Sequence, residues 1–297
     1  MEEDSPLAIR SVTLARALVR ITAVLVFAAI LGSAVAVHSA VAAPAVAPGT
    51  PAELRTTAAT ALDAALAKGG SGVRFEIVQT STLRARPGGP KVDVPDPANP
   101  RKTLRYADEY EIAALLERGQ VNAAGFFSEM LAGPAEGAKP DWDHAQVLFS
   151  ALVSGGERWR NDGEGWYRAD ALPGIGLDPE TTALLPRLLR DATKLADKGT
   201  IAPDDGLTLR AVDGAATEVD VPGVVAAGGE RFTKLTEPVT FGFDAAGRLA
   251  WLRVVALNTN STDYDLVVVT EIRLAYDAVD AIPSTDGLVL APVEEQR

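Results

Sequence analysis

His144, the one histidine outside the N-terminal leader, has the widest chemical repertoire of any side chain in this sequence. It ends the sequence Asp141-Trp142-Asp143-His144, which places three metal-binding side chains within four residues. A zinc site takes three or four protein ligands, but the only other histidine, His38, lies in the leader and cysteine is absent. His144 could also act as the base of a serine hydrolase, but the sequence has no Gly-x-Ser-x-Gly motif for the nucleophile. We therefore expect no catalytic residue, no metal and no cofactor.

Three short motifs also lack the context that their chemistry needs. The Gly-Ile-Gly at 174–176 has no third glycine and no strand-to-helix setting for a dinucleotide. The Asp-Asp-Gly at 204–206 lacks the spacing of a calcium-binding helix-loop-helix. The Asn-Ser-Thr at 260–262 matches a glycosylation sequon, a pattern that often occurs by chance. We interpret all three as turns or loops.

Composition excludes several classes of protein. The formal net charge of -12 repels phosphate backbones, so we expect no nucleic-acid partner. The lack of cysteine excludes disulfides, thiolate metal sites and a lipid anchor on cysteine. With 297 residues and 47% hydrophobic residues, the chain can form a sizeable core, and one domain over 50–292 is the simplest organisation.

The N-terminus predicts export. Arginines precede an uncharged apolar run at 21–37, and Ala-Val-Ala at 40–42 resembles a cleavage site, so 1–42 reads as a signal peptide. The alternative is an uncleaved anchor, because a helix continued to residue 43 would reach about 35 Å and cross a bilayer core. Either reading places the body outside the cytoplasm, after an Ala/Pro/Gly linker at 43–49.

Long strands dominate the C-terminal part of the sequence. Apolar residues or threonine occupy every even position from 264 to 276, which predicts one long strand with an apolar face. The segments 239–243 and 249–257 predict two more strands, separated by the turn Asp-Ala-Ala-Gly-Arg. Together they predict an antiparallel meander.

The N-terminal half of the body mixes helices and strands. A capping threonine, a proline and a glutamate at 50–53 predict a helix that ends at Gly69-Gly70, and 72–85 alternates as a strand. Five prolines at 86–101 predict an irregular surface excursion. Segments 108–118 and 122–131 read as short helices, with a strand as the alternative for the second. We treat 86–132 as an insertion.

The middle of the chain predicts hairpins and a leucine-rich helical lid. The apolar run at 145–153 predicts a strand, and Asn-Asp-Gly at 161–163 predicts a turn between strands that carry Trp159 and Trp166. Residues 178–198 predict a helical region with a kink at Pro186. Strands at 207–212 and 216–221 predict another hairpin around Asp-Gly at 213–214.

These elements predict an α+β fold, a large curved antiparallel sheet with helices packed on its concave face. An apolar cavity under such helices would suit a lipophilic ligand, although the same side chains could simply fill a core. The ligand-cavity candidates are Phe241, Phe243, Tyr264, Leu266, Val268, Ile272, Leu274 and Tyr276 from the strands, Trp159 and Trp166 from the hairpin, and Leu184, Leu188 and Leu195 from the lid.

This layout resembles the LolA/LppX-type carriers of lipoproteins and lipids. The features that carry the resemblance are the capped helix at 50–68, DGEGWY at 162–167, the leucine-rich lid at 186–196, FGFDAAGRL at 241–249, and a final tyrosine strand followed by Ile-Pro at 282–283. The resemblance implies an open half-barrel that binds an acyl chain. It also implies tethering through a lipidated cysteine in many members, which this chain lacks.

We therefore expect a non-enzymatic, extracytoplasmic carrier of a lipid or an acylated lipoprotein. The first alternative is a regulatory module on the same scaffold, which senses envelope lipid and signals to a membrane protein partner such as an anti-sigma factor. The second alternative, a secreted hydrolase, would depend on His144.

Overall fold

The computed structural model describes residues 47–95, 104–133, 142, 145–170, 172, 182–204, 207–216, 234–258, 263–276 and 279–291. The chain divides into two units, Met1–Ala43 and Pro44–Arg297, and every described element belongs to the second. The leader, His144, the Gly-Ile-Gly and the sequon lie outside the described residues. None of the helices in the described ranges has the length and apolarity needed to cross a membrane.

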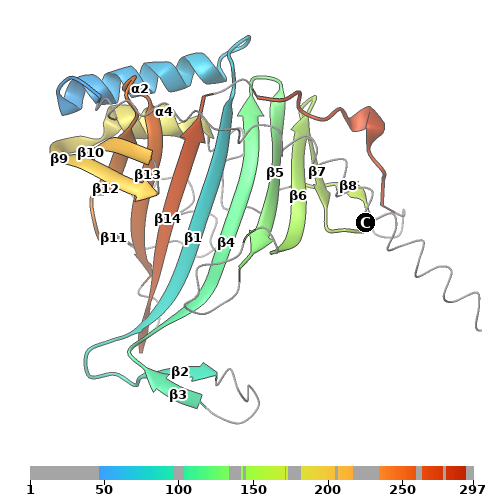
Figure 1. Ribbon diagram of the computed structural model, residues 1–297. Helices are drawn as coiled ribbons and strands as arrows, with labels where there is room; N and C mark the ends of the chain where they lie inside the picture. Colours follow the sequence, from blue (N-terminus) through green and yellow to red (C-terminus); the bar gives the residue numbers. More distant parts are fainter. Residues whose placement is uncertain are drawn as a thin grey trace, which may run out of the picture. The chain divides into compact units, whose positions relative to one another are not determined.

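One antiparallel sheet of 12 strands forms most of the second unit. Its strands are β1 (Val73–Ala85), β4 (Glu109–Asn122), β5 (Gly125–Ala132), β6 (Gln146–Ser154), β7 (Glu157–Asn161), β8 (Trp166–Arg168), β9 (Thr193–Asp204), β10 (Leu207–Ala215), β11 (Lys234–Leu235), β12 (Val239–Phe243), β13 (Leu249–Asn258) and β14 (Tyr264–Ala275). Figure 1 shows them in the order β8-β7-β6-β5-β4-β1-β14-β13-β12-β10-β9, with β11 beside β13. The sheet is not closed, because β8 and β9 are not paired with each other.

In the described ranges, two α-helices, a 3₁₀ helix and a short hairpin accompany the sheet. Helix α2 (Pro51–Leu66) begins with the predicted capping box, in which Thr50 and Glu53 exchange hydrogen bonds, and with proline at its start. Helix α4 (Leu184–Asp191) contacts α2, and the 3₁₀ helix η3 (Thr285–Gly287) lies near the C-terminus. Strand β2 (Val92–Pro95) lies in the proline-rich stretch at 86–101 and pairs with β3 (Leu104–Ala107), which follows that stretch. Our prediction of an irregular excursion was therefore wrong for 92–95. Pro95 ends its strand, where a missing N–H costs least.

The helix predicted at 108–118 was wrong, because β4 occupies this segment. For 122–131 the helix was also wrong, and the strand that we gave as the alternative is confirmed by β5. The sequence EIAALLER within β4 consists of strong helix formers, but propensity is a weak determinant when neighbours offer a full hydrogen-bond ladder. β4 pairs with β1 from Val121 opposite Val73 to Glu109 opposite Arg84, and with β5 on its other side. Tertiary pairing therefore outweighs local preference here.

In the described part of the predicted lid, residues 182–198, the helix is α4, and residues 178–181 lie outside the described residues. Pro186 lies in the first turn of α4, where its missing N–H has no intrahelical partner to lose, so it marks a helix start rather than a kink. The segment from Thr193 onward, which includes Leu195, is strand β9. The hairpin at 213–214 is also corrected, because β10 runs straight through Asp213 and Gly214.

Alternation along the strands gives the sheet two faces. The helix face carries Ile77, Ile272 and Leu252, which are aligned across β1, β14 and β13 and share a hydrophobic core with α2 and α4. The back face carries Glu76 and Arg273 at the neighbouring positions, and these two residues form an ion pair with a 2.6 Å distance between Nη1 and Oε1. The predicted antiparallel meander is confirmed for β12, β13 and β14.

Candidate functional site

The helix face is the candidate ligand-binding surface of the molecule, and one end of it is densely packed. At this end Phe241, Phe243 and Ile272 are exposed by no more than 1%. The rings of Phe241 and Phe243 stack with their centroids 6.5 Å apart. Since their neighbours exclude water, these side chains form a core rather than the wall of an empty space.

Helices α2 and α4 cover the packed end. The apolar stripe of α2 and the leucines of α4 belong to the same core cluster as the helix face; the buried members are Leu54, Ala58, Ala59, Leu62, Ala65, Leu185, Leu188 and Leu189. The turn between β12 and β13 lies against α2, because a Cβ added to Gly247 would meet Leu54 and Thr57. Arg55 of α2 donates to the Ala192 carbonyl at 3.0 Å, and Asp63 forms an ion pair with Arg190. The two helices are therefore tied to each other as well as to the sheet.

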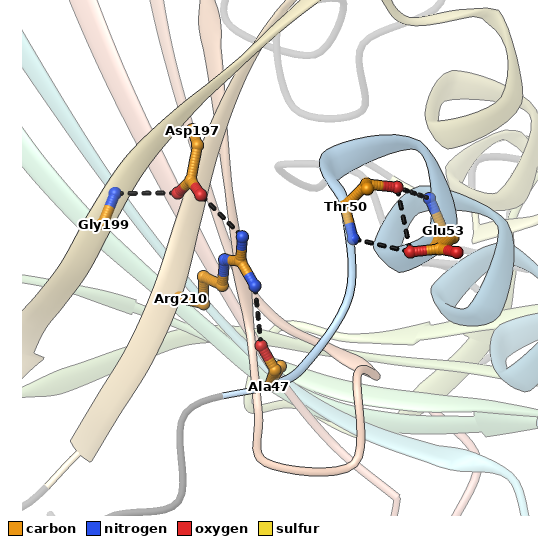
Figure 2. Close-up of polar contacts among 6 residues, drawn as sticks. All are labelled: Ala47, Thr50, Glu53, Asp197, Gly199 and Arg210. Carbon is orange, nitrogen blue, oxygen red and sulfur yellow. Dashed lines mark hydrogen bonds and ion pairs between the residues drawn. The ribbon is translucent and has the colours of Figure 1, made fainter.

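The chain enters α2 through a fixed junction, which Figure 2 shows. Arg210 of β10 donates to the carbonyl oxygen of the buried residue Ala47 at 2.9 Å and to Asp197 of β9 at 2.6 Å. The hydrogen bond from Arg210 to Asp197, followed by that from the N–H of Gly199, holds the pKa of the Asp197 carboxyl below its ordinary value. The position of α2 is thus fixed from the first residue that the structure describes.

The helix face is less covered at its other end. On β1 and β14, Leu83 and Leu266 face each other across the register, and both are half-buried. Leu115 of β4 is half-buried on the same face. The helix face therefore has a packed apolar end under the helices and a partly exposed apolar end beyond them.

A belt of buried polar side chains lies between these two ends. The hydroxyl of Ser128 donates to Glu117 Oε1 at 2.7 Å, and Gln79 Nε2 donates to Thr270 Oγ1 at 3.2 Å. All four residues are exposed by 2% or less. Because a buried carboxylate or amide is costly unless hydrogen-bonded, these pairs fix the register of β1, β4, β5 and β14 at this level.

Tyr276 ends the packed side of the helix face. Its ring lies under the Arg248 guanidinium, with Cζ 5.0 Å from the ring centroid. Burial, followed by the charge of Asp244, raises the pKa of the Tyr276 hydroxyl above its ordinary value, and Arg248 partly opposes this shift. Burial therefore favours the neutral phenol form of Tyr276.

Most of the predicted cavity residues come together on the helix face. The core cluster includes Phe241, Phe243, Val268, Ile272, Leu274 and Leu188, and Leu195, Leu266 and Tyr276 pack against it. Tyr264 continues the face at the exposed end of β14, where its hydroxyl donates to the Lys91 carbonyl oxygen at 3.2 Å. Leu184 is half-buried at the start of α4.

The two tryptophans of the predicted cavity are not part of this face. Trp159 lies opposite Leu152 across the register, and Leu152 lies opposite Phe127. These three residues form a second cluster, with Trp166 packed against it. Phe127 follows Phe126 of the main core in the strand, so the second cluster lies on the back face.

The back face is otherwise charged around its centre. Glu76 forms ion pairs with both Arg118 and Arg273, at 3.3 Å and 2.6 Å. Burial raises the pKa of the Glu129 carboxyl, and the charge of Arg118 partly opposes that shift. Such half-exposed pairs each contribute little to stability, so this surface mainly keeps the back of the sheet soluble.

Metal binding finds no support in the part of the chain that the structure describes. No group of three His, Cys, Asp or Glu side chains there could hold a metal ion. Asp141, Asp143 and His144 lie outside that part, so the hydrolase alternative stays a prediction that nothing here tests.

Comparison with known proteins adds no assignment. The chain matches no protein-family model and no curated protein. The helix face is therefore the feature of the molecule that bears on its function.

Sequence reasoning missed two parts of the molecule. The polar belt was missed because Glu117 and Ser128 fell in segments interpreted as helices. The contact of residues 279–291 with the back face was missed because this segment has no periodicity. For the belt, Gln79 and Thr270 were the available signals, as polar residues on the apolar faces of two predicted strands.

Proposed function

We propose that this chain is a non-enzymatic, extracytoplasmic carrier that binds an acyl chain of a lipid or lipoprotein on the helix face. In this proposal the sheet is an open half-barrel, and α2 and α4 cover its concave side. The acyl chain lies along the apolar surface from the partly exposed end toward the helices.

The change in burial along the helix face is the observation that carries the proposal. Phe241 and Ile272 are fully packed at one end, whereas Leu83, Leu115 and Leu266 lie on the same face with only partial cover. Covering apolar surface contributes roughly 25 cal/mol per Å². An acyl chain on these residues would therefore gain free energy without any change of fold.

Movement of the helices would extend the binding surface. Because α4 is tied to α2 through Arg55 and Arg190, the gating unit in this proposal is the pair of helices rather than residues 179–198 alone. Opening of that pair would expose the packed end of the face to the remainder of a long acyl chain.

A charge placed on the helix face should block binding, while the same charge on the back face should not. Leu83→Glu puts a carboxylate among half-buried leucines, and burying that charge against an acyl chain is costly. We expect uptake of a fluorescent fatty acid to weaken by about tenfold or more. The measurement is a fluorescence titration of the purified protein.

Thr82→Glu is the matched control, since Thr82 is the neighbouring half-buried residue of β1 and points to the opposite face. Its affinity for the fatty acid should stay close to that of the unmodified protein. Equal losses in both variants, or no uptake by the unmodified protein together with no lipid in its organic extract, would contradict the proposal.

A further inference from the structure

A C-terminal arm (residues 279–291) leaves the centre of the sheet and crosses its back face. At the start of the arm, Asp280 forms two hydrogen bonds with Gln120 of β4, one through its N–H at 3.1 Å and one through its carbonyl at 3.3 Å. The Asp280 carboxylate also pairs with Arg74 of β1 at 3.1 Å. The root of the arm is therefore fixed to the two neighbouring strands.

The middle of the arm covers the second hydrophobic cluster. Ile282 and Leu288 pack against Phe127, Leu152 and Trp159. Without the arm, these large side chains would form an apolar patch on a mostly charged face. The arm thus fills a preformed aromatic site.

The end of the arm pairs with the outermost strand β8 at a single position. Trp166 N–H donates to the Val289 carbonyl at 2.8 Å, and Ala291 N–H donates to the Trp166 carbonyl at 2.9 Å. These two bonds make a parallel bridge between Trp166 and Leu290. The arm therefore binds β8 through backbone hydrogen bonds, a mode of peptide binding that depends little on the sequence of the bound segment.

Two observations indicate that the arm fits this site incompletely. The indole Nε1 of Trp159 is buried and has no acceptor among the described residues, although Trp159 is only 8% exposed. Val289 and Leu290 are 78% and 54% exposed, the two highest values among the large apolar side chains of the described part. An occupant with an acceptor for Trp159 would fit better.

We propose that β8 and the Phe127–Leu152–Trp159 cluster form a strand-addition site for an extended apolar peptide segment of a partner protein, which the C-terminal arm occupies in its absence. The occupant pairs with Trp166 through its backbone in the parallel direction and places an aliphatic side chain where Leu288 lies. A carbonyl of the occupant accepts from Trp159 Nε1. This site lies on the back face, so it is independent of lipid binding on the helix face.

The test uses the full chain and a fluorescent peptide with the sequence of residues 286–297 as the probe. Ala291→Pro removes the N–H that donates to Trp166 and so weakens the arm without altering the site. We expect this variant to bind the peptide at least ten times more tightly than the unmodified protein, as measured by fluorescence anisotropy. Leu288→Ser offers a second way to weaken the arm if the proline variant folds poorly.

Two glycines of the turn before β8 provide matched site variants. A Cβ at Gly165 would lie 2.7 Å from Ala291 N and 2.8 Å from its Cα, so Gly165→Ala obstructs any occupant of the strand position. Gly163 also has a positive φ, but a Cβ there meets nothing within 4 Å. Added to Ala291→Pro, Gly165→Ala should abolish peptide binding and Gly163→Ala should retain it.

Three outcomes would overturn the proposal. The first is the absence of peptide binding in both arm variants. The second is binding that survives Gly165→Ala. The third is a dimer of the arm variants before the peptide is added, which would make the occupant a second copy of this chain instead of a partner's segment.

Discussion

Replacing Phe241 by alanine should lower the free energy of unfolding by about 3–5 kcal/mol, the largest loss we expect from a single side-chain truncation in this molecule. Phe241 is 1% exposed, stacks on Phe243 and lies close to Gly214 of β10. The cavity would open in the core beneath α2 and α4, where close packing on several sides prevents collapse. Denaturant unfolding followed by tryptophan fluorescence measures the change.

Val147→Ala is the control for this experiment. Val147 is also apolar, but it is 47% exposed, so its truncation should change stability by no more than about 0.5 kcal/mol. If Phe241→Ala cost as little as this control, the packed end of the helix face would not be a core.

Replacing Gly119 by alanine should cost about 3 kcal/mol or more, because the added Cβ has no space. It would lie 2.6 Å from the Phe75 ring and 2.8 Å from Ser128 Cβ, and it would also meet the Phe127 carbonyl oxygen. That carbonyl belongs to the backbone of β5 and cannot rotate away, so the pairing between β4 and β5 would have to separate. Thermal or denaturant unfolding measures the loss.

Gly155→Ala is the comparison variant, because it adds the same Cβ without a clash. Gly155 has φ 61° and nothing within 4 Å of an added Cβ, so alanine there should cost about 1 kcal/mol. If 108–118 were a helix, Gly119 would follow its C-terminal end, and the Phe127 carbonyl would not oppose an added Cβ. A loss from Gly119→Ala no larger than that from Gly155→Ala would therefore contradict the strand pairing around β4.

The sequence is most informative where local chemistry and the final environment agree. Thr50, Pro51 and Glu53 specify the start of α2 through hydrogen bonds made within one turn. The even positions of 264–276 specify β14 because one of its faces is buried against a core. In both cases the signal depends only on neighbouring residues.

The sequence is least informative where distant partners decide the structure. β4 has a helix-forming composition, but it lies between β1 and β5, and no local pattern encodes that pairing. β9 is an outermost strand with largely exposed side chains, so it has no apolar alternation to detect. The assignment of Trp159 to the helix face was wrong for a related reason. Alternation shows which residues of a strand share a face, but it does not show on which side of the sheet that face lies.

The candidate site was predictable in its composition but not in its extent. Phe241, Ile272 and Leu274 were expected on one apolar face, and the structure places them together. Their complete burial depends on how closely α2 and α4 approach the sheet, which sequence spacing does not reveal. The partly exposed end at Leu83 and Leu115 became visible only with the register of β1, β4 and β14.

Photo-crosslinking with a diazirine-labelled fatty acid tests the central claim most directly, because it reports where an acyl chain lies. The protein is loaded, irradiated and digested, and the labelled residues are identified by mass spectrometry. Our account predicts label on the helix face at the exposed ends of β1 and β14, around Leu83 and Leu266. Label confined to the back face, or no label above that of a protein unfolded in denaturant, would contradict it.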